Sequence, residues 1–173
     1  MEKVIAHQIN RVSVKMFSRS KALSLFNRIL LQDSTVISLP KNMWRLFSGC
    51  GGSASKAAIK IDIIFDLVYN RVLSAKFVAG KVPDAKFSND ILDQLEENDL
   101  VIRDLGYFIL KCFKEIIKSN YFISRLSKPV YVYLNKDDSK PLELIEYLQK
   151  LDIQNGIDID VYIGKLERLP VRD

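Results

Sequence analysis

Apolar residues recur along this chain in short blocks, and the spacing within each block indicates which element it forms. Residues 4–26 have apolar positions at helix-like spacing, which predicts one or two helices that lead into a domain. The apolar run 29–31 continues into polar residues, and we predict a buried strand there that reaches a polar end. A glycine-rich stretch, 49–55, then precedes two β-type segments at 57–68 and 72–79, which together predict a hairpin.

After Gly80 the pattern alternates between helical and extended blocks. The expected elements are a helix at 88–97, a strand at 100–104, an amphipathic helix at 107–119, a strand at 121–126, a strand at 130–134, a helix at 141–151 and a strand at 157–163. Residues 168–173 show no closing element. The order as far as 126 predicts an RNase H-like α/β core, in which three antiparallel strands are followed by parallel strands with flanking helices.

Composition limits the class of protein and its surroundings. The chain has 173 residues and 48% hydrophobic content, enough for the core of one globular unit. Lys and Arg number 26 against 21 Asp and Glu, and the net charge of +5 favours a polyanionic partner such as nucleic acid. Cys50 and Cys112 form no Cys-x-x-Cys pair, which argues against a zinc site or a disulfide framework. Without a signal-like or membrane-length apolar run, a cytoplasmic location is expected.

Two aspartates carry the main chemical prediction. The sequence predicts that Asp33 and Asp104 each finish a short apolar strand, and ligands collect at the carboxyl ends of strands in open α/β sheets. Two clustered carboxylates need cations, and hard oxygen ligands favour Mg²⁺ or Mn²⁺ over zinc. The alternative is structural, because an aspartate at a strand end is commonly a turn former. Asp104 could equally cap the helix expected from Tyr107.

Five ordered motifs surround these aspartates and extend the prediction. They are Asp33-Ser34-Thr35-x-x-Ser38-Leu39-Pro40, a glycine-rich loop with Lys56 and Lys60 at the start of the hairpin, Gly80-Lys81-Val82-Pro83-Asp84, Asp104-Leu105-Gly106-Tyr107-Phe108, and Phe122-Ile123-Ser124-Arg125-Leu126. Together they resemble the bacterial insertion-sequence transposases of the DDE class, the insertion-sequence-four family. The resemblance covers about 30–128 and continues more loosely beyond.

The resemblance implies roles for several residues. Asp33 would be the first catalytic carboxylate and Asp104 the second, both binding Mg²⁺ or Mn²⁺ for attack on double-stranded DNA by water and then by the freed 3′ hydroxyl. One ion lowers the pKa of the nucleophile while the other neutralises the leaving oxygen. Arg125 matches a family position near the transposon end, where it would grip a phosphate, although a solvated strand-end cation is an equal alternative. Lys56, Lys60 and Lys128 would add phosphate contacts or be ordinary surface charge.

The chain also departs from the family pattern. The third carboxylate of the family is a glutamate in a Tyr-x-x-Arg-x-x-x-Glu motif, and no tyrosine here has an arginine three positions on. We therefore expect a chain truncated at both ends: a helical lead-in at 1–28, a catalytic core at 29–128 and the start of a β-rich insertion at 129–173. Such a product would be inactive alone, and its partners would be transposon-end and target DNA, a second copy or a full-length transposase.

Two other functions remain as alternatives. The chain could be a non-catalytic DNA-binding or regulatory transposase fragment. It could also be an RNase H-fold nuclease unrelated to transposition, which would need another acid within the chain; Glu115 follows the second aspartate on a helix, but its neighbours give no reason to direct it at the metals. For Asp84 we prefer a turn or loop role. Trp44 and Tyr107 could stack on bases, but packing in the core is the commoner fate of such residues.

Overall fold

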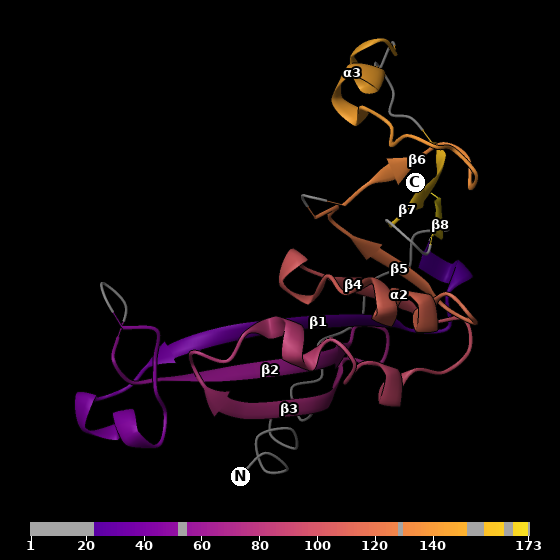
Figure 1. Ribbon diagram of the computed structural model, residues 1–173. Coiled ribbons are helices and arrows are strands. Elements are labelled where there is room, and N and C mark those ends of the chain that lie inside the picture. The colour runs from indigo at the N-terminus through magenta and orange to yellow at the C-terminus, as the bar shows by residue number, and fades with distance from the viewer. Residues whose placement is uncertain (1–22, 52–54, 128–129, 152–157, 165–167, 173) are drawn as a thin grey trace. The chain divides into compact units, whose positions relative to one another are not determined.

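Five strands form the central sheet of this protein, in the order β3-β2-β1-β4-β5 (Figure 1). The computed structural model describes residues 23–51, 55–127, 130–151, 158–164 and 168–172. The chain divides into two compact units, residues 1–125 and residues 126–173, and the five-stranded sheet belongs to the first unit. Most of the helical lead-in expected at 4–26 lies outside the described residues. Its last part, from residue 23, contains a 3₁₀ turn, η1 (Leu23–Leu25).

The sheet combines an antiparallel meander with a parallel half. Strands β1 (Ile29–Ser38), β2 (Ala58–Asp66) and β3 (Arg71–Ala79) are antiparallel neighbours. Strand β4 (Leu100–Arg103) runs parallel to β1, and β5 (Tyr121–Ser124) runs parallel to β4. This topology confirms the predicted RNase H-like α/β class. The polar stretch after residue 31 does not end the first strand, because β1 stays paired with β2 as far as Ser38.

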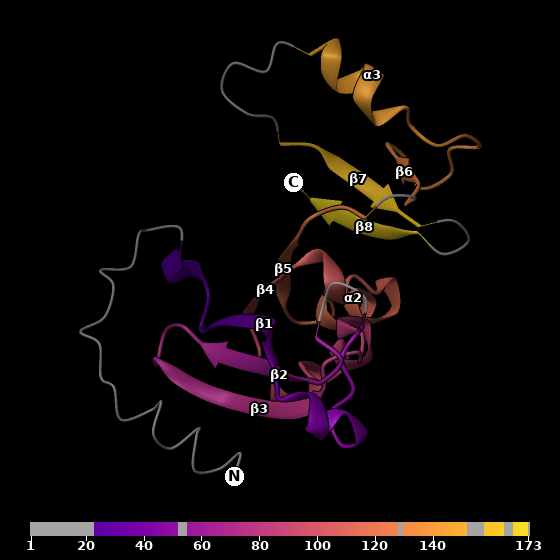
Figure 2. The same cartoon turned by 90° about the vertical axis from the view of Figure 1, so that its left-hand side faces the viewer.

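One face of the sheet carries the core. Buried and half-buried residues alternate strictly along β2, as expected for a strand with one covered face. Helix α2 (Leu110–Ile116) and the 3₁₀ turns η3 (Asp84–Phe87), η4 (Leu92–Gln94) and η5 (Leu105–Tyr107) lie on that face (Figure 2). The buried apolar residues there include Ile64, Ile91, Val101, Phe113 and Ile116.

Two helices differ from the sequence-based expectation. The helix expected at 88–97 is wrong: only short 3₁₀ turns form, because the Ser88 hydroxyl donates to the Tyr107 carbonyl and the Glu96 backbone N–H is bound by the Asp99 carboxylate. The helix expected at 107–119 is shorter, because Ile109 is extended and α2 begins at Leu110. Among the described helices, none is long and apolar enough to cross a membrane.

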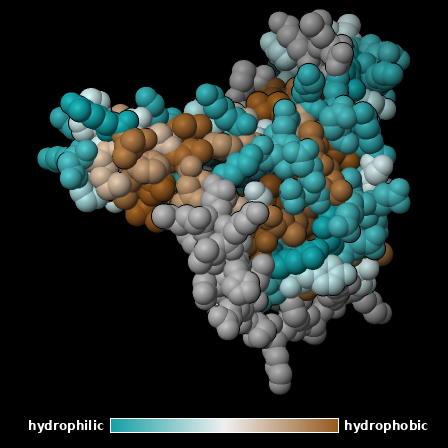
Figure 3. Space-filling model, turned by 90° about the horizontal axis from the view of Figure 1, so that it is seen from below, coloured by the Kyte–Doolittle hydropathy of each residue, from teal (hydrophilic) through white to brown (hydrophobic). Residues whose placement is uncertain are grey.

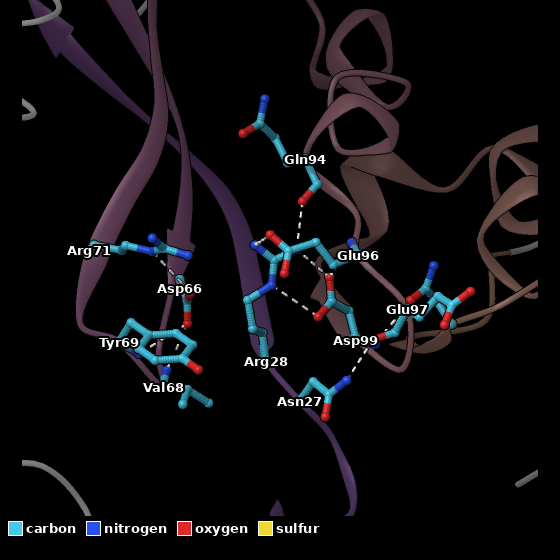
Figure 4. A network of polar contacts seen from close by, with 11 residues as sticks. Asn27, Arg28, Asp66, Val68, Tyr69, Arg71, Gln94, Glu96, Glu97 and Asp99 are labelled. Carbon is cyan, nitrogen blue, oxygen red and sulfur yellow. Dashed lines mark hydrogen bonds and ion pairs between the residues drawn. The ribbon is translucent and has the colours of Figure 1, made fainter.

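A buried ion pair joins the starts of β1 and β4 (Figure 4). Arg28 precedes β1 and is 3% exposed, and Asp99 precedes β4 and is fully buried. The Arg28 guanidinium donates to both Asp99 carboxylate oxygens, at 3.0 and 2.6 Å, and also to the Gln94 carbonyl at 2.7 Å. Bidentate pairs of this kind fix orientation as well as distance. The amino ends of the two parallel strands are therefore held together.

The second unit contains a smaller antiparallel sheet, in the order β6-β7-β8. Its elements are β6 (Val132–Tyr133), α3 (Leu144–Gln149), β7 (Asp160–Ile163) and β8 (Leu169–Arg172). The expectation that residues 168–173 contain no closing element is wrong, because β8 pairs with β7. Pro170 can belong to β8 because this strand lies at the edge of the sheet, where an absent N–H is tolerated.

Candidate metal site beside the parallel strands

Asp33 and Asp104 lie at neighbouring positions on β1 and after β4. The last residues paired between these parallel strands are Gln32 and Arg103, and the two aspartates follow them directly. Because side chains alternate between faces, both aspartates project from the face opposite Gln32 and Arg103. Both are exposed. The sequence predicted that Asp33 ends its strand, and this prediction is wrong. Asp33 instead lies where the pairing of β1 with β4 stops, and β1 continues paired with β2 alone.

Directly before the aspartates, buried polar side chains hold the two strands in register. Gln32 and Arg103 are 2% and 4% exposed. The Arg103 guanidinium donates to the Gln32 side-chain oxygen at 3.4 Å and to the Ser88 carbonyl at 2.8 Å, while the Gln32 amide donates to the Phe87 carbonyl at 3.0 Å. Sequence analysis did not single out either residue.

A buried carboxyl lies in the same polar layer. Asp62, on β2, is 1% exposed and accepts hydrogen bonds from the Tyr107 hydroxyl at 2.5 Å and from the Gln32 amide at 3.4 Å. Burial raises the pKa of Asp62, and these two hydrogen bonds oppose that rise. Burial and the Asp62 carboxyl together raise the pKa of Tyr107, so its hydroxyl stays protonated and donates. Tyr107 is 1% exposed, so it packs in the core, the role preferred from the sequence over stacking on bases.

Asp84 supports the segments that follow both aspartates. Its carboxylate accepts from the Ser34 hydroxyl at 2.8 Å and pairs with the Lys60 ammonium at 2.6 Å. A Cβ added to Gly106 would lie 2.8 Å from the Asp84 Oδ2 atom, so a larger residue there would force the Asp84 side chain to shift. Lys60 is 6% exposed, which does not support its expected contact with DNA phosphates. Its charge instead neutralises Asp84.

Arg125 brings a positive charge to Asp104. It directly follows β5, whose last residue pairs with Arg103, so it lies beside Asp104 on the same face. The Arg125 Nε donates to the Asp104 carboxylate at 3.1 Å, and its terminal nitrogen makes a second contact. Two hydrogen bonds to the carboxylate lower the pKa of Asp104. The larger effect comes from the Leu105 backbone N–H and the smaller from the Arg125 side chain. Asp104 is therefore ionised at neutral pH.

The donor set suits a hard divalent cation. Asp33 and Asp104 offer exposed carboxylate oxygens from adjacent strands. The Arg125 guanidinium forms an ion pair with the Asp104 carboxylate, so this carboxylate already has a cationic partner. Within the described ranges, no group of three His, Cys, Asp or Glu side chains could hold a metal ion. Glu115 does not join the pair, because it lies on α2, over the other face, and its carboxylate binds Lys118.

The remaining predicted contacts are placed as follows. Lys56 is exposed after the glycine-rich loop, and Lys128 lies outside the described residues. The two cysteines are free, Cys50 exposed and Cys112 buried. The buried set of Gln32, Asp62 and Arg103 was missed, although Lys60, Asp62 and Asp66, which share one face of β2, were a visible signal for its Asp62 member.

Comparisons with known proteins point to one family. Residues 24–162 match the family model described as the transposase DDE domain. The chain is 39% identical over 116 residues to the transposase for insertion sequence element IS231B of Bacillus thuringiensis subsp. berliner, covering 66% of this chain and 24% of the relative. It is 32% identical to that for IS231C, covering 88% and 35%, and 25% identical to that for IS1151 of Clostridium perfringens, covering 85% and 34%. The chain thus spans about a quarter to a third of the length of these relatives.

Proposed function

This chain belongs to the transposase DDE domain family, and from that premise we propose that it forms part of the catalytic core of a DNA transposase. In this proposal Asp33 and Asp104 are two carboxylates of a divalent-metal site that acts on DNA phosphodiesters. The observation that carries the proposal is the register of β1 and β4, which sets the two aspartates side by side on an exposed face.

The chemistry follows from the residues around the pair. A Mg²⁺ or Mn²⁺ ion bound there would lower the pKa of an attacking water or 3′ hydroxyl and neutralise a phosphate oxygen. Asp33 and Asp104 supply the negative charge that holds such an ion. Arg125, which is largely exposed, can exchange its hydrogen bonds to Asp104 for hydrogen bonds to a DNA phosphate. The buried layer of Gln32, Asp62 and Arg103 keeps both strands fixed while this exchange takes place.

We further propose that this chain alone binds DNA without completing cleavage. The family resemblance calls for a third carboxylate, and the two acids assembled here give a cation fewer ligands than a complete site. Transposon-end and target DNA are the proposed partners, in the cytoplasm. A second copy or a full-length transposase is the proposed protein partner, and of these two only the full-length transposase would supply the missing acid. Cleavage of a transposon-end duplex by the purified chain in Mg²⁺ or Mn²⁺, abolished by Asp33→Ala, would contradict the inactive state.

The coupling between cation and DNA tests the proposed function. Fluorescence anisotropy of a labelled duplex should show DNA affinity rising several-fold when Mn²⁺ is added, because Asp33 and Asp104 would hold an ion whose positive charge attracts DNA phosphate. Asp33→Asn and Asp104→Asn should each remove that gain. Glu115→Gln is the matched control, since Glu115 is exposed but lies away from the pair. A gain that survives both aspartate substitutions would refute the proposed site.

The second candidate is a non-catalytic DNA-binding or regulatory fragment. The net charge of +5 and the exposed Lys56 favour it, because phosphate binding requires cations but no metal site. Salt-dependent DNA binding that is indifferent to Mn²⁺ and unchanged in Asp33→Asn and Asp104→Asn would identify this function.

A further inference from the structure

A structured projection extends the sheet between β1 and β2. We call residues 36–51 and 55–57 the tip; it contains the 3₁₀ turn η2 (Lys41–Arg45) and lies at the left of Figure 1. Backbone hydrogen bonds close its base: Leu39 N–H to the Ala57 carbonyl at 2.8 Å, Ala58 N–H to the Phe47 carbonyl at 2.9 Å, and Gly49 N–H to the Lys56 carbonyl at 2.8 Å. The fold therefore presents the side chains of the tip on an ordered support.

The tip displays large apolar side chains to solvent. Trp44 is 54% exposed and Leu46 is 77% exposed, and Val36 and Ile37 on the adjoining end of β1 are about half exposed. Figure 3 shows apolar surface mixed with polar surface along this projecting arm. Sequence analysis expected Trp44 to pack in the core. Its exposure contradicts that expectation and leaves the indole available to a partner.

The charge around Trp44 has a single sign. No Asp or Glu occurs anywhere from Ser34 to Ile61. Lys41, Arg45 and Lys56 are exposed, and in the described part of the chain none of them pairs with a carboxylate. The Arg45 guanidinium lies 5.8 Å from the Trp44 ring, at the distance of a cation–π contact. An exposed aromatic ring thus lies beside the Arg45 guanidinium, in a stretch of chain that carries exposed cations and no acid.

We propose that the tip is a DNA-contacting element, in which Trp44 stacks on an unpaired base while Lys41, Arg45 and Lys56 bind the adjoining phosphates. Aromatic stacking combined with a cationic track is the usual chemistry of single-strand binding. An unpaired base is favoured because the base faces of an intact duplex are already stacked. A symmetric contact between two copies would bring these cations together, and the repulsion disfavours it. The proposal goes beyond the metal site, since none of its residues belongs to that site.

Trp44 is the only tryptophan of the chain, so intrinsic fluorescence reports on the tip alone. Titration with a thymidine oligonucleotide, or with a duplex carrying a short single-stranded overhang, should quench this fluorescence. Trp44→Ala should weaken overhang binding about tenfold, and Trp44→Phe should restore part of the loss. Each of Lys41→Gln, Arg45→Gln and Lys56→Gln should reduce the dependence of log affinity on log salt by about 0.7. Lys111→Gln, on α2, is the matched exposed control and should change neither value.

Three results would overturn the proposal. One is binding of labelled oligonucleotide with no change in Trp44 fluorescence and full affinity in Trp44→Ala. Another is absence of any oligonucleotide binding at low salt. The third is fluorescence that shifts with protein concentration alone, together with a sedimenting dimer that Trp44→Ala dissociates; the tip would then be a contact between copies. Quenching should persist in the Asp33→Asn/Asp104→Asn double variant, so failure of the metal site and failure of the tip give different results.

Discussion

Asp62 is the residue whose environment departs furthest from that of a surface carboxylate. It is almost fully buried, and its two partners are neutral donors from Tyr107 and Gln32. With no cation paired to it, desolvation dominates and its pKa is raised. The folded protein therefore holds a proton on this group to a higher pH than the unfolded chain does. Its contribution to stability is present at low pH and is lost as pH rises through the folded-state pKa.

Substitution of Asp62 should expose that pH dependence. Asp62→Asn places a donor opposite the Gln32 amide, and we expect a loss of about 1–3 kcal/mol in the free energy of unfolding at pH 5. The loss should be smaller at pH 8, because the wild type is then weakened by its buried carboxylate and the variant is not. Urea unfolding of the wild type and the variant at pH 5 and at pH 8 measures these free energies of unfolding. Asp93→Asn, at an exposed site, should show no such trend, and a loss that grows with pH would contradict the assignment.

Individual residues were only partly predictable from the sequence. Asp33 and Asp104 could be singled out because each follows an apolar run, and their roles stay predictions. The polar layer behind them was missed, because alternation along 58–66 separates two faces but does not say which one is covered. Here the face with Lys60, Asp62 and Asp66 is the buried one, while Ile61 and Ile63 on the other face are partly exposed.

Among the secondary-structure elements, β1 and β4 depend most on one contact, the Arg28–Asp99 pair at their starts. Asp99→Asn should destabilise the protein by about 3–5 kcal/mol, because it removes the buried counter-charge of Arg28 and leaves only the exposed Glu96 paired with this guanidinium. Asp93→Asn serves again as the exposed control. Thermal unfolding with hydrogen exchange at β4 amides would measure the loss. Equal stability of both variants would show that the pair does not hold these strands together.

Strands were predicted more accurately than helices. The five core strands appear in the expected order because their apolar runs are long enough to define them. The helix at 88–97 failed because tertiary hydrogen bonds of Ser88 and Asp99 override its local pattern. Strand β8 was missed because a proline argues against a strand unless the strand is known to be at an edge, which depends on its partners.

At the scale of the whole molecule, one strand connects both proposed contacts with DNA. Asp33 marks the point where β1 leaves β4, and the far end of the same strand leads into the tip. Both lie in the unit of residues 1–125, so they share one sheet. The chain spans about a quarter to a third of the length of its transposase relatives. Within this length it contains the two aspartates of the proposed metal site, Asp33 and Asp104.

Direct binding of Mn²⁺ tests the central claim that Asp33 and Asp104 form a metal site. Electron paramagnetic resonance of free Mn²⁺, titrated with purified protein, should show binding by the wild type and by Glu115→Gln. Asp33→Asn and Asp104→Asn should each weaken that binding by at least about tenfold, because each removes a ligand charge. Wild-type affinity in both aspartate variants, or no binding by the wild type at millimolar Mn²⁺, would contradict the account.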